Sequence, residues 1–220
     1  MSPTYPARTY SLRQTKSGPG LRLLGGAERI FAAIALAALA PVLLAIALVI
    51  FLLCRRGPLV RHQRVGWKGA PLAMLKLRTM WQAERDSSYF QWIEDVSGPV
   101  DEAKSGRDVR VTSRFASACR RYSLDELPQL WHVARGEMSL VGPRPVTRRE
   151  HETHYGEWTD EVLSVRPGMT GLWQIMGRSH LTYERRRRLD LILVRKASAR
   201  LYLHILLRSL PVVISGDGAY

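Results

Sequence analysis

The stretch that decides the fold is IFAAIALAALAPVLLAIALVIFLLC, Ile30 to Cys54. It runs for 25 residues without a charge, with Glu28 and Arg29 directly before it and Arg55 and Arg56 directly after it. About 20 apolar residues are enough for a helix to cross the hydrocarbon layer of a membrane. A secretory signal peptide fits poorly, because its apolar region is usually only about 7 to 15 residues long and a small-residue cleavage site follows it. The sequence therefore predicts a helix that lies in a membrane.

A proline near the middle of this segment, Pro41, bears on how the helix lies. A proline inside a helix removes one hydrogen bond and clashes with the preceding turn, so a break or kink is expected there. Basic residues flank the segment equally, so the positive-inside rule gives no orientation; they are Arg8, Arg13, Lys16, Arg22 and Arg29 before it and Arg55, Arg56, Arg61, Arg64 and Lys68 after it. Two arrangements stay open: an ordinary kinked span, and a bent helix that enters and leaves by the cytoplasmic face.

Composition limits the classes of protein that the chain can belong to. Its 220 residues suit one domain with an appended segment. The 33 Lys and Arg residues against 19 Asp and Glu give a net charge of +14, which calls for an anionic partner such as nucleic acid, anionic lipid or a phosphorylated substrate. Cys54 and Cys119 form no CxxC pair, so neither a zinc site nor a disulfide framework is indicated. The sequence also lacks the HExxH, GxGxxG and GxxxxGK[ST] motifs.

The chain after the apolar segment has the composition of a globular domain. Residues Leu59 to Met80 predict two short strands around a turn at Lys68 to Pro71. The acidic stretch from Glu84 to Asp108 is typical of an exposed helix and loop. We therefore expect a mostly α-helical (α+β) fold with one short β-hairpin.

The end of the chain, from Leu181 to Ile214, combines basic and apolar residues at helical spacing. This pattern is typical of amphipathic helices that lie at a membrane interface. The run from Arg185 to Arg188 would also suit contacts with the phosphates of a nucleic acid. The apolar segment in the same chain favours lipid.

The sequence SLDELPQL, Ser123 to Leu130, places two adjacent carboxylates, Asp125 and Glu126, at the predicted start of a helix. Ser123 and Glu126 have the spacing of a capping box; because Pro128 fits only the first turn, Asp125 is the alternative cap. The helix dipole is expected to favour the ionised carboxylates. This suits a helix cap, a nucleophile and a magnesium ligand equally well.

Arginines in rigid turns surround this pair in the sequence. Arg120 precedes it, Arg144 lies between Pro143 and Pro145 in a GPRP turn, and Arg166 opens RPGMTG. Guanidinium groups match phosphate oxygens, and prolines fix the backbone that presents them. Each arginine could instead pair with an acidic residue of the chain or with a lipid headgroup. Together they predict an anion-binding pocket.

Four blocks of the sequence resemble the bacterial sugar transferases, which are monotopic phosphoglycosyl transferases. They are GPLVRHQRVGWKG (Gly57 to Gly69), MLKLRTM (Met74 to Met80), RRYSLDELPQLWHVARGEMSLVGPRP (Arg120 to Pro145) and RPGMTGLWQIMGRS (Arg166 to Ser179). Leu189 and Asp190 also match. With the apolar segment, the resemblance covers nearly the whole chain after about residue 25.

The resemblance implies a reaction and a set of site residues. Asp125 would attack the β-phosphate of a UDP-sugar, release UMP and pass the sugar phosphate to undecaprenyl phosphate through an aspartyl intermediate. Asp125 would also bind Mg²⁺, and Glu126 would be the second catalytic residue. Residues that match substrate-binding positions are Lys76, Arg78, Arg120, Pro143, Arg144, Pro145 and Arg166. A homodimer is left open, and no nucleic-acid partner is implied.

The resemblance also implies a location and three parts of the chain. These are a basic segment (1–29), a re-entrant membrane helix broken at Pro41 (30–54) and a cytosol-facing catalytic domain (55–220). The active site would face the cytoplasm from the bacterial inner membrane, whose anionic lipids the chain would contact. The competing hypothesis is a non-enzymatic membrane-anchored basic protein that binds nucleic acid or anionic lipid.

The sequence departs from the family pattern at several positions. Ala40 stands before Pro41 where the family usually has Ser, and His132 stands where it usually has Asn. An acidic residue near the start of the membrane segment is missing at Ala32 and Ala33, and Tyr202 stands where a later Asp is expected. These departures concern the membrane helix and the C-terminal helices more than the chemistry.

Overall fold

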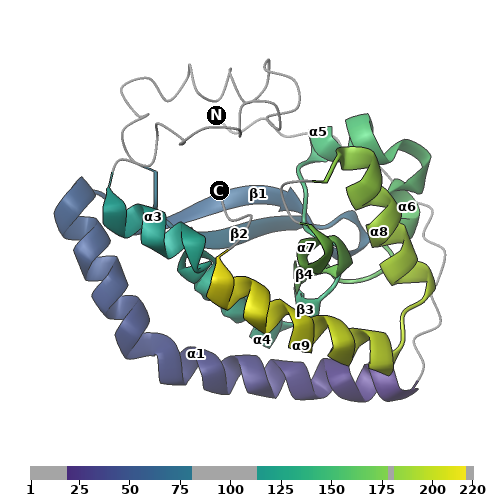
Figure 1. Cartoon of the computed structure of the whole chain (residues 1–220), viewed down its shortest axis with the longest axis horizontal. Helices are drawn as coiled ribbons and strands as arrows, with labels where there is room; N and C mark the ends of the chain where they lie inside the picture. Colours follow the sequence, from purple (N-terminus) through teal and green to yellow (C-terminus); the bar gives the residue numbers. More distant parts are fainter. Residues whose placement is uncertain (1–18, 81–112, 178–180, 217–220) are drawn as a thin grey trace.

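A long N-terminal helix, α1 (Pro19–Cys54), runs along one side of the molecule and changes direction partway along (Figure 1). The computed structural model describes residues 19–80, 113–177 and 181–216. Pro41 lies inside α1, and the helix continues on both sides of it. The proline therefore accounts for a bend rather than for an interruption of the helix. Within the described ranges, α1 is the one helix long and apolar enough to cross a membrane.

Both sections of α1 contribute side chains to the core. Ala32 packs in one cluster with Leu130, Val133 and Ile205, and Ile46 and Ile50 pack in a second cluster with Leu77 and Cys119. The other faces of α1 are exposed, although they carry large apolar side chains such as Ile30, Phe31, Leu44 and Leu52. The helix is thus part of the folded unit along most of its length.

The predicted hairpin is confirmed. Strand β1 (Leu59–Val65) pairs antiparallel with β2 (Pro71–Leu77), with Leu59 opposite Leu77 and Val65 opposite Pro71. The 3₁₀ turn η1 (Trp67–Gly69) joins them and includes Lys68 at a φ of 57°. The tip of the hairpin contacts the distant segment 163–164, because the Trp67 indole N–H donates to the Ser164 carbonyl oxygen at 3.1 Å and the Lys68 amide to that of Leu163 at 2.9 Å.

Three short helices follow one another around the acidic pair: α3 (Arg114–Arg121), the 3₁₀ helix η3 (Leu124–Gln129) and α4 (Leu130–Arg135). The expected capping box is wrong. Ser123 has a left-handed backbone with a φ of 54°, and its side chain caps nothing. Gly136 ends α4 in the left-handed region, as is common at helix C-termini.

A second small sheet, which the sequence did not predict, joins the segment before the GPRP turn to the RPGMTG loop. Strand β3 (Ser139–Val141) pairs in parallel with β4 (Gly168–Thr170). Just beyond this pair the backbones approach so closely that a Cβ on Gly168 would lie 2.0 Å from the Gly142 nitrogen. Glycine is required there because no side chain fits. This contact brings the GPRP turn against the RPGMTG loop.

The C-terminal half is helical. A cluster of short helices precedes β4: α5 (Arg148–Glu150), η4 (His151–Tyr155), η5 (Gly156–Trp158) and α6 (Thr159–Val162). After β4 come α7 (Leu172–Met176), α8 (Tyr183–Arg195) and α9 (Ala199–Ser215). The helical periodicity seen from Leu181 to Ile214 therefore corresponds to α8 and α9, whereas nearly all of the acidic stretch 84–108 lies outside the described residues.

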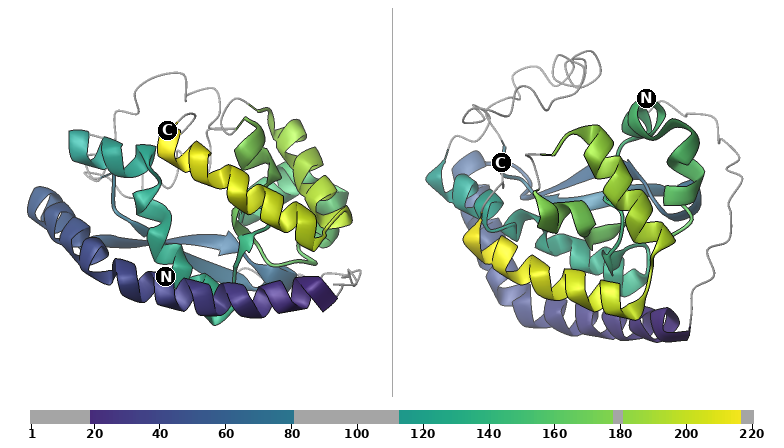
Figure 2. Two further views of the ribbon diagram at one scale, coloured as in Figure 1. Left: turned by 60° about the horizontal axis from the view of Figure 1, so that its bottom comes forward. Right: turned by 45° about the vertical axis from the view of Figure 1, so that its right-hand side comes forward.

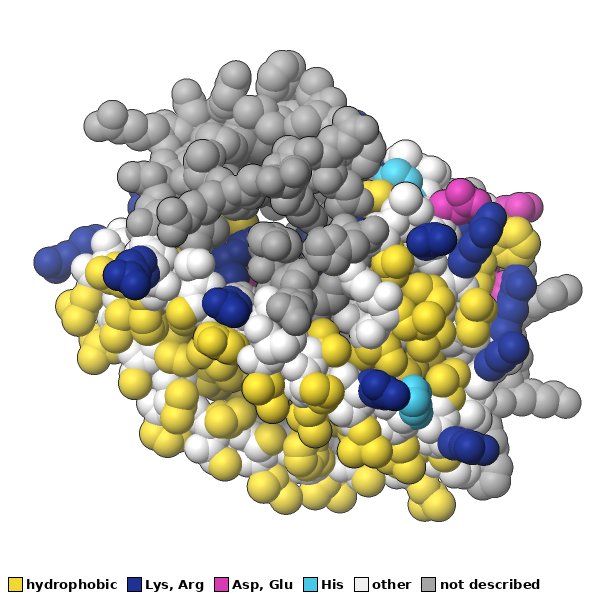
Figure 3. Space-filling model, in the orientation of Figure 1, with side chains coloured by type: hydrophobic (Ala, Val, Ile, Leu, Met, Phe, Trp, Pro, Cys, Tyr) yellow, Lys and Arg dark blue, Asp and Glu magenta, His cyan; other side chains and the backbone are white. Residues whose placement is uncertain are grey.

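Helix α9 packs against the first section of α1, as the right view in Figure 2 shows. Hydrophobic side chains gather over these two helices in Figure 3. The large exposed apolar side chains of α9 are Leu203, Leu207, Leu210 and Ile214, whereas Tyr202 and Ile205 face the core. One side of α9 therefore packs on the protein, and the other presents an apolar surface.

A buried carboxylate joins α1 to two distant elements. Glu28 Oε2 accepts hydrogen bonds from the Ser139 hydroxyl (2.8 Å), the Leu140 amide (3.0 Å) and the Tyr202 hydroxyl (2.5 Å). Ala32, where an acidic group was found missing, is fully buried in the core. Glu28 thus supplies an acidic group one helical turn before Ala32, and the Tyr202 hydroxyl on α9 donates to it.

Candidate active site

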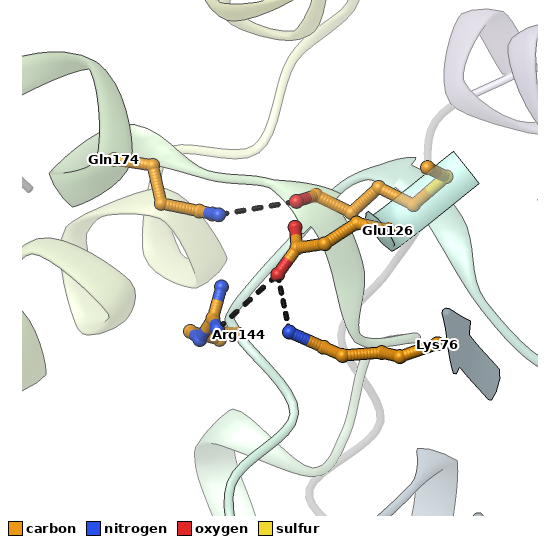
Figure 4. A network of polar contacts seen from close by, with 5 residues as sticks. Lys76, Glu126, Arg144 and Gln174 are labelled. Carbon is orange, nitrogen blue, oxygen red and sulfur yellow. Dashed lines mark hydrogen bonds and ion pairs between the residues drawn. The ribbon is translucent and has the colours of Figure 1, made fainter. Parts of the chain in front are cut away.

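Asp125 and Glu126 lie in η3, which packs against β2. Asp125 is buried. The Glu126 carboxylate points into a polar network in which Lys76 of β2 and Arg144 of the GPRP turn approach the same oxygen (Figure 4). The distances from Glu126 Oε1 are 2.7 Å to Lys76 Nζ and 3.5 Å to Arg144 Nη2. The fold thus brings together four of the predicted site residues from three separate segments.

The two neighbouring carboxyls have opposite pKa shifts. Burial alone would raise the pKa of Glu126, but the charges and hydrogen bonds of Lys76 and Arg144 outweigh it and lower the pKa to about 2. Glu126 is therefore ionised at every physiological pH. It contacts two cations, Lys76 and Arg144, next to Asp125.

Burial raises the pKa of Asp125 to about 6, and the charge of Glu126 adds to this effect while Lys76 and Arg120 oppose it. The expectation that the helix dipole would favour the ionised form is wrong for Asp125. The helix is a six-residue 3₁₀ turn, and desolvation is the larger effect. Since its pKa lies below 7, Asp125 is still mostly ionised at neutral pH.

Arg144 is held in place by the backbone around it. Pro143 and Pro145 are buried, the Pro143 carbonyl accepts from the Gly168 amide at 2.8 Å, and the Val146 carbonyl accepts from the Val65 amide at 3.0 Å. The guanidinium lies 5.8 Å from the centre of the Trp173 ring. The GPRP turn is thus hydrogen-bonded to β1 on one side and to the RPGMTG loop on the other, which fixes the backbone of Arg144.

The other predicted cations lie elsewhere or act at longer range. Arg120 affects Asp125 through its charge. Arg78 donates from Nε to the Gly57 carbonyl at 2.8 Å, which ties the end of the hairpin to its beginning. Arg166 lies over the Trp67 ring at 4.6 Å, and burial together with the Arg29 charge lowers its pKa. Substrate contacts by these three arginines stay predictions.

Two residues join the site that sequence patterns did not single out for a role. Gln174 of α7 points toward the network in Figure 4, and its Nε2 donates to the Met169 carbonyl at 3.1 Å. Asp190 of α8 is fully buried and accepts from the Tyr155 hydroxyl at 2.8 Å. Burial raises the pKa of Asp190 to about 7, although Tyr155 and the Arg144 charge lower it. Gln174 lies in one of the matching blocks and Asp190 matches outside them, but their positions in the sequence give no sign of these contacts.

The acidic pair suits a divalent cation only in part. In the portion of the chain that the structure describes, no cluster of three or more His, Cys, Asp or Glu residues could hold a metal ion. No ion pair among these residues uses the carboxylate of Asp125. Magnesium usually binds through one or two carboxylates together with substrate phosphates and water. The donor set therefore fits Mg²⁺ only if a phosphorylated substrate completes it.

Comparison with known proteins identifies the family. The family model described as "Bacterial sugar transferase" matches residues 25–216, so the chain belongs to this family. It is similar to the UDP-galactose-lipid carrier transferase of Erwinia amylovora, with 41% identity over 186 residues that cover 80% of this chain and 38% of the relative. It is also similar to the UDP-glucose:undecaprenyl-phosphate glucose-1-phosphate transferase of Caulobacter vibrioides, with 39% identity over 198 residues that cover 86% of this chain and 68% of the relative.

A third relative is the undecaprenyl-phosphate galactose phosphotransferase of Salmonella typhimurium, which is 38% identical over 164 residues. These residues cover 72% of this chain and 34% of that protein. The chain thus spans less than two fifths of the Erwinia and Salmonella relatives. The relatives' names concern sugar transfer to a lipid carrier.

Proposed function

We propose that this protein transfers a sugar 1-phosphate from a UDP-sugar to undecaprenyl phosphate and releases UMP, as a first membrane step of polysaccharide synthesis. The observation that carries the proposal is a buried Asp125, free of ion pairs in the described ranges, beside a Glu126 that holds Lys76 and Arg144. Membership of the family and the names of the relatives support the same reaction.

The proposed reaction proceeds in two displacements at phosphorus. A carboxylate oxygen of Asp125 attacks the β-phosphorus of the UDP-sugar, the bond from that phosphorus to the bridging oxygen breaks, and UMP leaves with the electron pair. An oxygen of undecaprenyl phosphate then attacks the same phosphorus and displaces Asp125, which returns to a free carboxylate. A covalent intermediate divides one difficult displacement into two easier ones.

Lys76 and Arg144 supply the positive charge that this chemistry needs. The diphosphate and the carboxylate of Asp125 are both anionic, so their approach is repulsive unless cations lie between them. Glu126 holds the Lys76 ammonium and the Arg144 guanidinium on the same oxygen, 2.7 and 3.5 Å away. The cations are thus placed before substrate arrives. Arg144 can also offer a fork of two N–H groups to phosphate oxygens.

Mg²⁺ is proposed as the cofactor, with Asp125 as its protein ligand and the substrate diphosphate as the remainder of its site. The ion would supply charge neutralisation on the phosphate oxygens. Asp125 is buried and has no ion-pair partner among the residues that the structure describes, which supports its oxygens as ligands of such a cation.

The proposed location is the bacterial inner membrane, with the active site on the cytoplasmic side. The bent helix α1 would enter and leave by that face, and the exposed apolar side of α9 would lie in the interface. Basic residues near both ends of the apolar segment would contact anionic lipids. The competing hypothesis of a non-enzymatic binding protein gains no support, since the relatives are sugar transferases.

The experiment that tests the function measures UMP release from a panel of UDP-sugars by the purified protein with undecaprenyl phosphate and Mg²⁺. One UDP-sugar is expected to give turnover, and Asp125→Asn is expected to abolish it while the protein stays folded, since the amide is isosteric but a poor nucleophile. Glu157→Gln is the matched control, because this carboxylate is exposed on η5. Normal turnover by Asp125→Asn would exclude the proposed mechanism.

A second measurement examines the covalent step by itself. Protein incubated with the active UDP-sugar in the absence of undecaprenyl phosphate should gain the mass of one phosphosugar on the peptide that contains Asp125. Release of UMP without any such adduct would argue for direct transfer between the two substrates.

A further inference from the structure

A buried histidine links the helix that follows the acidic pair to the strand that carries Lys76. His132 lies in α4. Its Nε2 lies 3.2 Å from the amide nitrogen of Leu75 in β2, and its Nδ1 lies 2.6 Å from Oε2 of Glu137. A buried ring with a partner on each nitrogen has a fixed orientation.

The two partners determine which nitrogen carries the proton. The Leu75 amide can only donate, so Nε2 must be unprotonated and accept. Nδ1 then carries the proton and donates it to Glu137. This hydrogen bond lowers the pKa of Glu137, against its partial burial, and Arg135 lowers it further by donating from Nε to Oε1 at 2.8 Å. The hydrogen bonds therefore assign acceptor and donor roles to Nε2 and Nδ1 of His132.

The backbone keeps Glu137 next to this ring. The His132 carbonyl accepts hydrogen bonds from the amides of Glu137 at 2.9 Å and Met138 at 3.1 Å. Gly136, at a φ of 73°, makes the turn between them. The ring, its carboxylate partner and the end of α4 thus form one rigid corner.

The Nε2 atom of His132 contacts Leu75, the residue that directly precedes Lys76 in β2. Leu75 pairs with Arg61 across the hairpin, and β1 and β2 form a sheet of only two strands. The edge of β2 that faces away from β1 therefore needs other acceptors for its amides. His132 supplies one of them. The next side chain, Lys76, reaches Glu126 at 2.7 Å.

We propose that His132 is a positioning residue that fixes β2 against α4, so that Lys76 reaches Glu126 in the active site. This inference rests on the proposed function for its kinetic consequence but not for its structural one. Helix α4 continues directly from η3, which carries Glu126, so the contact sets the distance between the two partners. A shift of β2 along its own direction would carry Lys76 away, because neighbouring side chains of a strand point to opposite faces.

The test compares His132→Leu, which removes the acceptor, with His132→Gln, whose amide oxygen can still accept from Leu75. His132→Leu is expected to lower kcat for UMP release by about 10- to 100-fold, the range that follows from misplacement of a site group by about 1 Å. His132→Gln is expected to restore most of the lost activity. Equal losses in the two variants would overturn the proposal.

A double-mutant cycle with Lys76→Met separates positioning from a general loss of stability. If His132 acts through Lys76, its removal has almost no further effect on kcat once Lys76 is gone, within about 2-fold. If the loss of kcat in the double variant equals the product of the losses in the two single variants, His132 supports the fold without acting on the pair of Lys76 and Glu126. If His132→Leu does not fold, Glu137→Ala replaces it in the cycle. The Glu137 carboxylate is partly exposed, and its removal leaves the His132 ring without the hydrogen bond that orients it.

A readout without catalysis distinguishes failure of this inference from failure of the proposed function. Hydrogen exchange of the peptide that contains Leu75 should be faster in His132→Leu than in the wild type, and close to wild type in His132→Gln. Unchanged exchange in His132→Leu would refute the link itself. Wild-type protein that shows this exchange pattern but releases no UMP would refute only the proposed reaction.

Discussion

At the scale of single residues, the site rests on two adjacent carboxyls in different surroundings. Asp125 is desolvated, and its pKa is raised to about 6, while Glu126 is ion-paired, and its pKa is lowered to about 2. A desolvated carboxylate is a stronger nucleophile than one that is ion-paired, because little stabilises its charge. These surroundings support the proposed role of Asp125 as the nucleophile, and they place two cations on Glu126.

The raised pKa of Asp125 predicts the pH dependence of the reaction. In the proposed reaction the ionised form attacks phosphorus, and the carboxyl becomes protonated as the pH falls through about 6. The rate of UMP release at low substrate concentration should therefore be constant above about pH 7 and fall about tenfold per unit well below pH 6. A rate that stays constant down to pH 4.5 would contradict the assignment of Asp125 as the nucleophile in this environment.

Replacement of Lys76 should change both the rate and its pH dependence. The Lys76 charge lowers the pKa of both Asp125 and Glu126. In Lys76→Met both pKa values rise, so the acidic limb of the pH–rate profile should move to higher pH, and kcat should fall by about 10-fold or more because a site cation is lost. Lys76→Arg should keep the limb near its wild-type position. The exposed Lys68 on the hairpin turn provides the control Lys68→Met, which should change neither quantity.

Sequence patterns identified the residues of this network but not their electrostatics. Asp125, Glu126, Lys76 and Arg144 were all predicted as site residues, and the structure brings them together. The sign of the Asp125 shift was missed because burial depends on the packing of distant segments. The contact between His132 and Leu75 was missed for the same reason, since these two residues are 57 positions apart.

At the scale of elements, the two small sheets position the cations. The hairpin β1–β2 presents Lys76, and the pair β3–β4 presents Arg144 in the turn that follows β3. The hairpin was predictable because two β-rich stretches flank a glycine-containing turn. The pair β3–β4 was not, because strands of three residues leave no periodic pattern and their partners lie far apart in the chain. The predicted capping box does not form because Ser123 adopts a left-handed backbone conformation, which the residues around it do not predict.

A methyl group on Gly168 should disrupt the contact between the two loops. A Cβ there would lie 2.0 Å from the Gly142 nitrogen, which is backbone and cannot move aside. Gly168→Ala is expected to destabilise the fold by about 3 kcal/mol, which lowers the melting temperature by about 10 °C, and to reduce UMP release through displacement of Arg144. Gly57→Ala is the matched control, because nothing lies within 4 Å of its added Cβ. A melting temperature of Gly168→Ala equal to that of the control would contradict the observed packing.

At the scale of the whole molecule, α1 and α9 form one apolar side, and the charged network lies among the segments above them. The apolar segment and a break or kink at Pro41 were evident from the sequence, but the continuation of the helix through Pro41 and the burial of Glu28 were not. Glu28 joins α1 to β3 and α9 through three hydrogen bonds. These bonds fix the helix relative to the strand that leads into the GPRP turn.

The proposed re-entrant helix predicts the sidedness of both ends of the chain. Tags placed at residue 1 and at residue 220 should both be digested by protease in inverted inner-membrane vesicles and protected in spheroplasts. A helix that bends at Pro41 and returns leaves its two ends on one face, because each half is too short to cross. Digestion of the N-terminal tag in spheroplasts would indicate a spanning helix instead.

The burial of Ala32, Ile46 and Ile50 among residues of α4, β2 and α3 has a consequence for protein engineering. Helix α1 is not an interchangeable module that merely tethers the rest of the chain. A truncation before β1, or a chimera with an unrelated membrane anchor, would leave Leu77, Cys119 and Val133 without the partners that cover them. Soluble variants of this protein are therefore better sought by replacing the outward apolar side chains of α1 with polar ones than by deleting the helix.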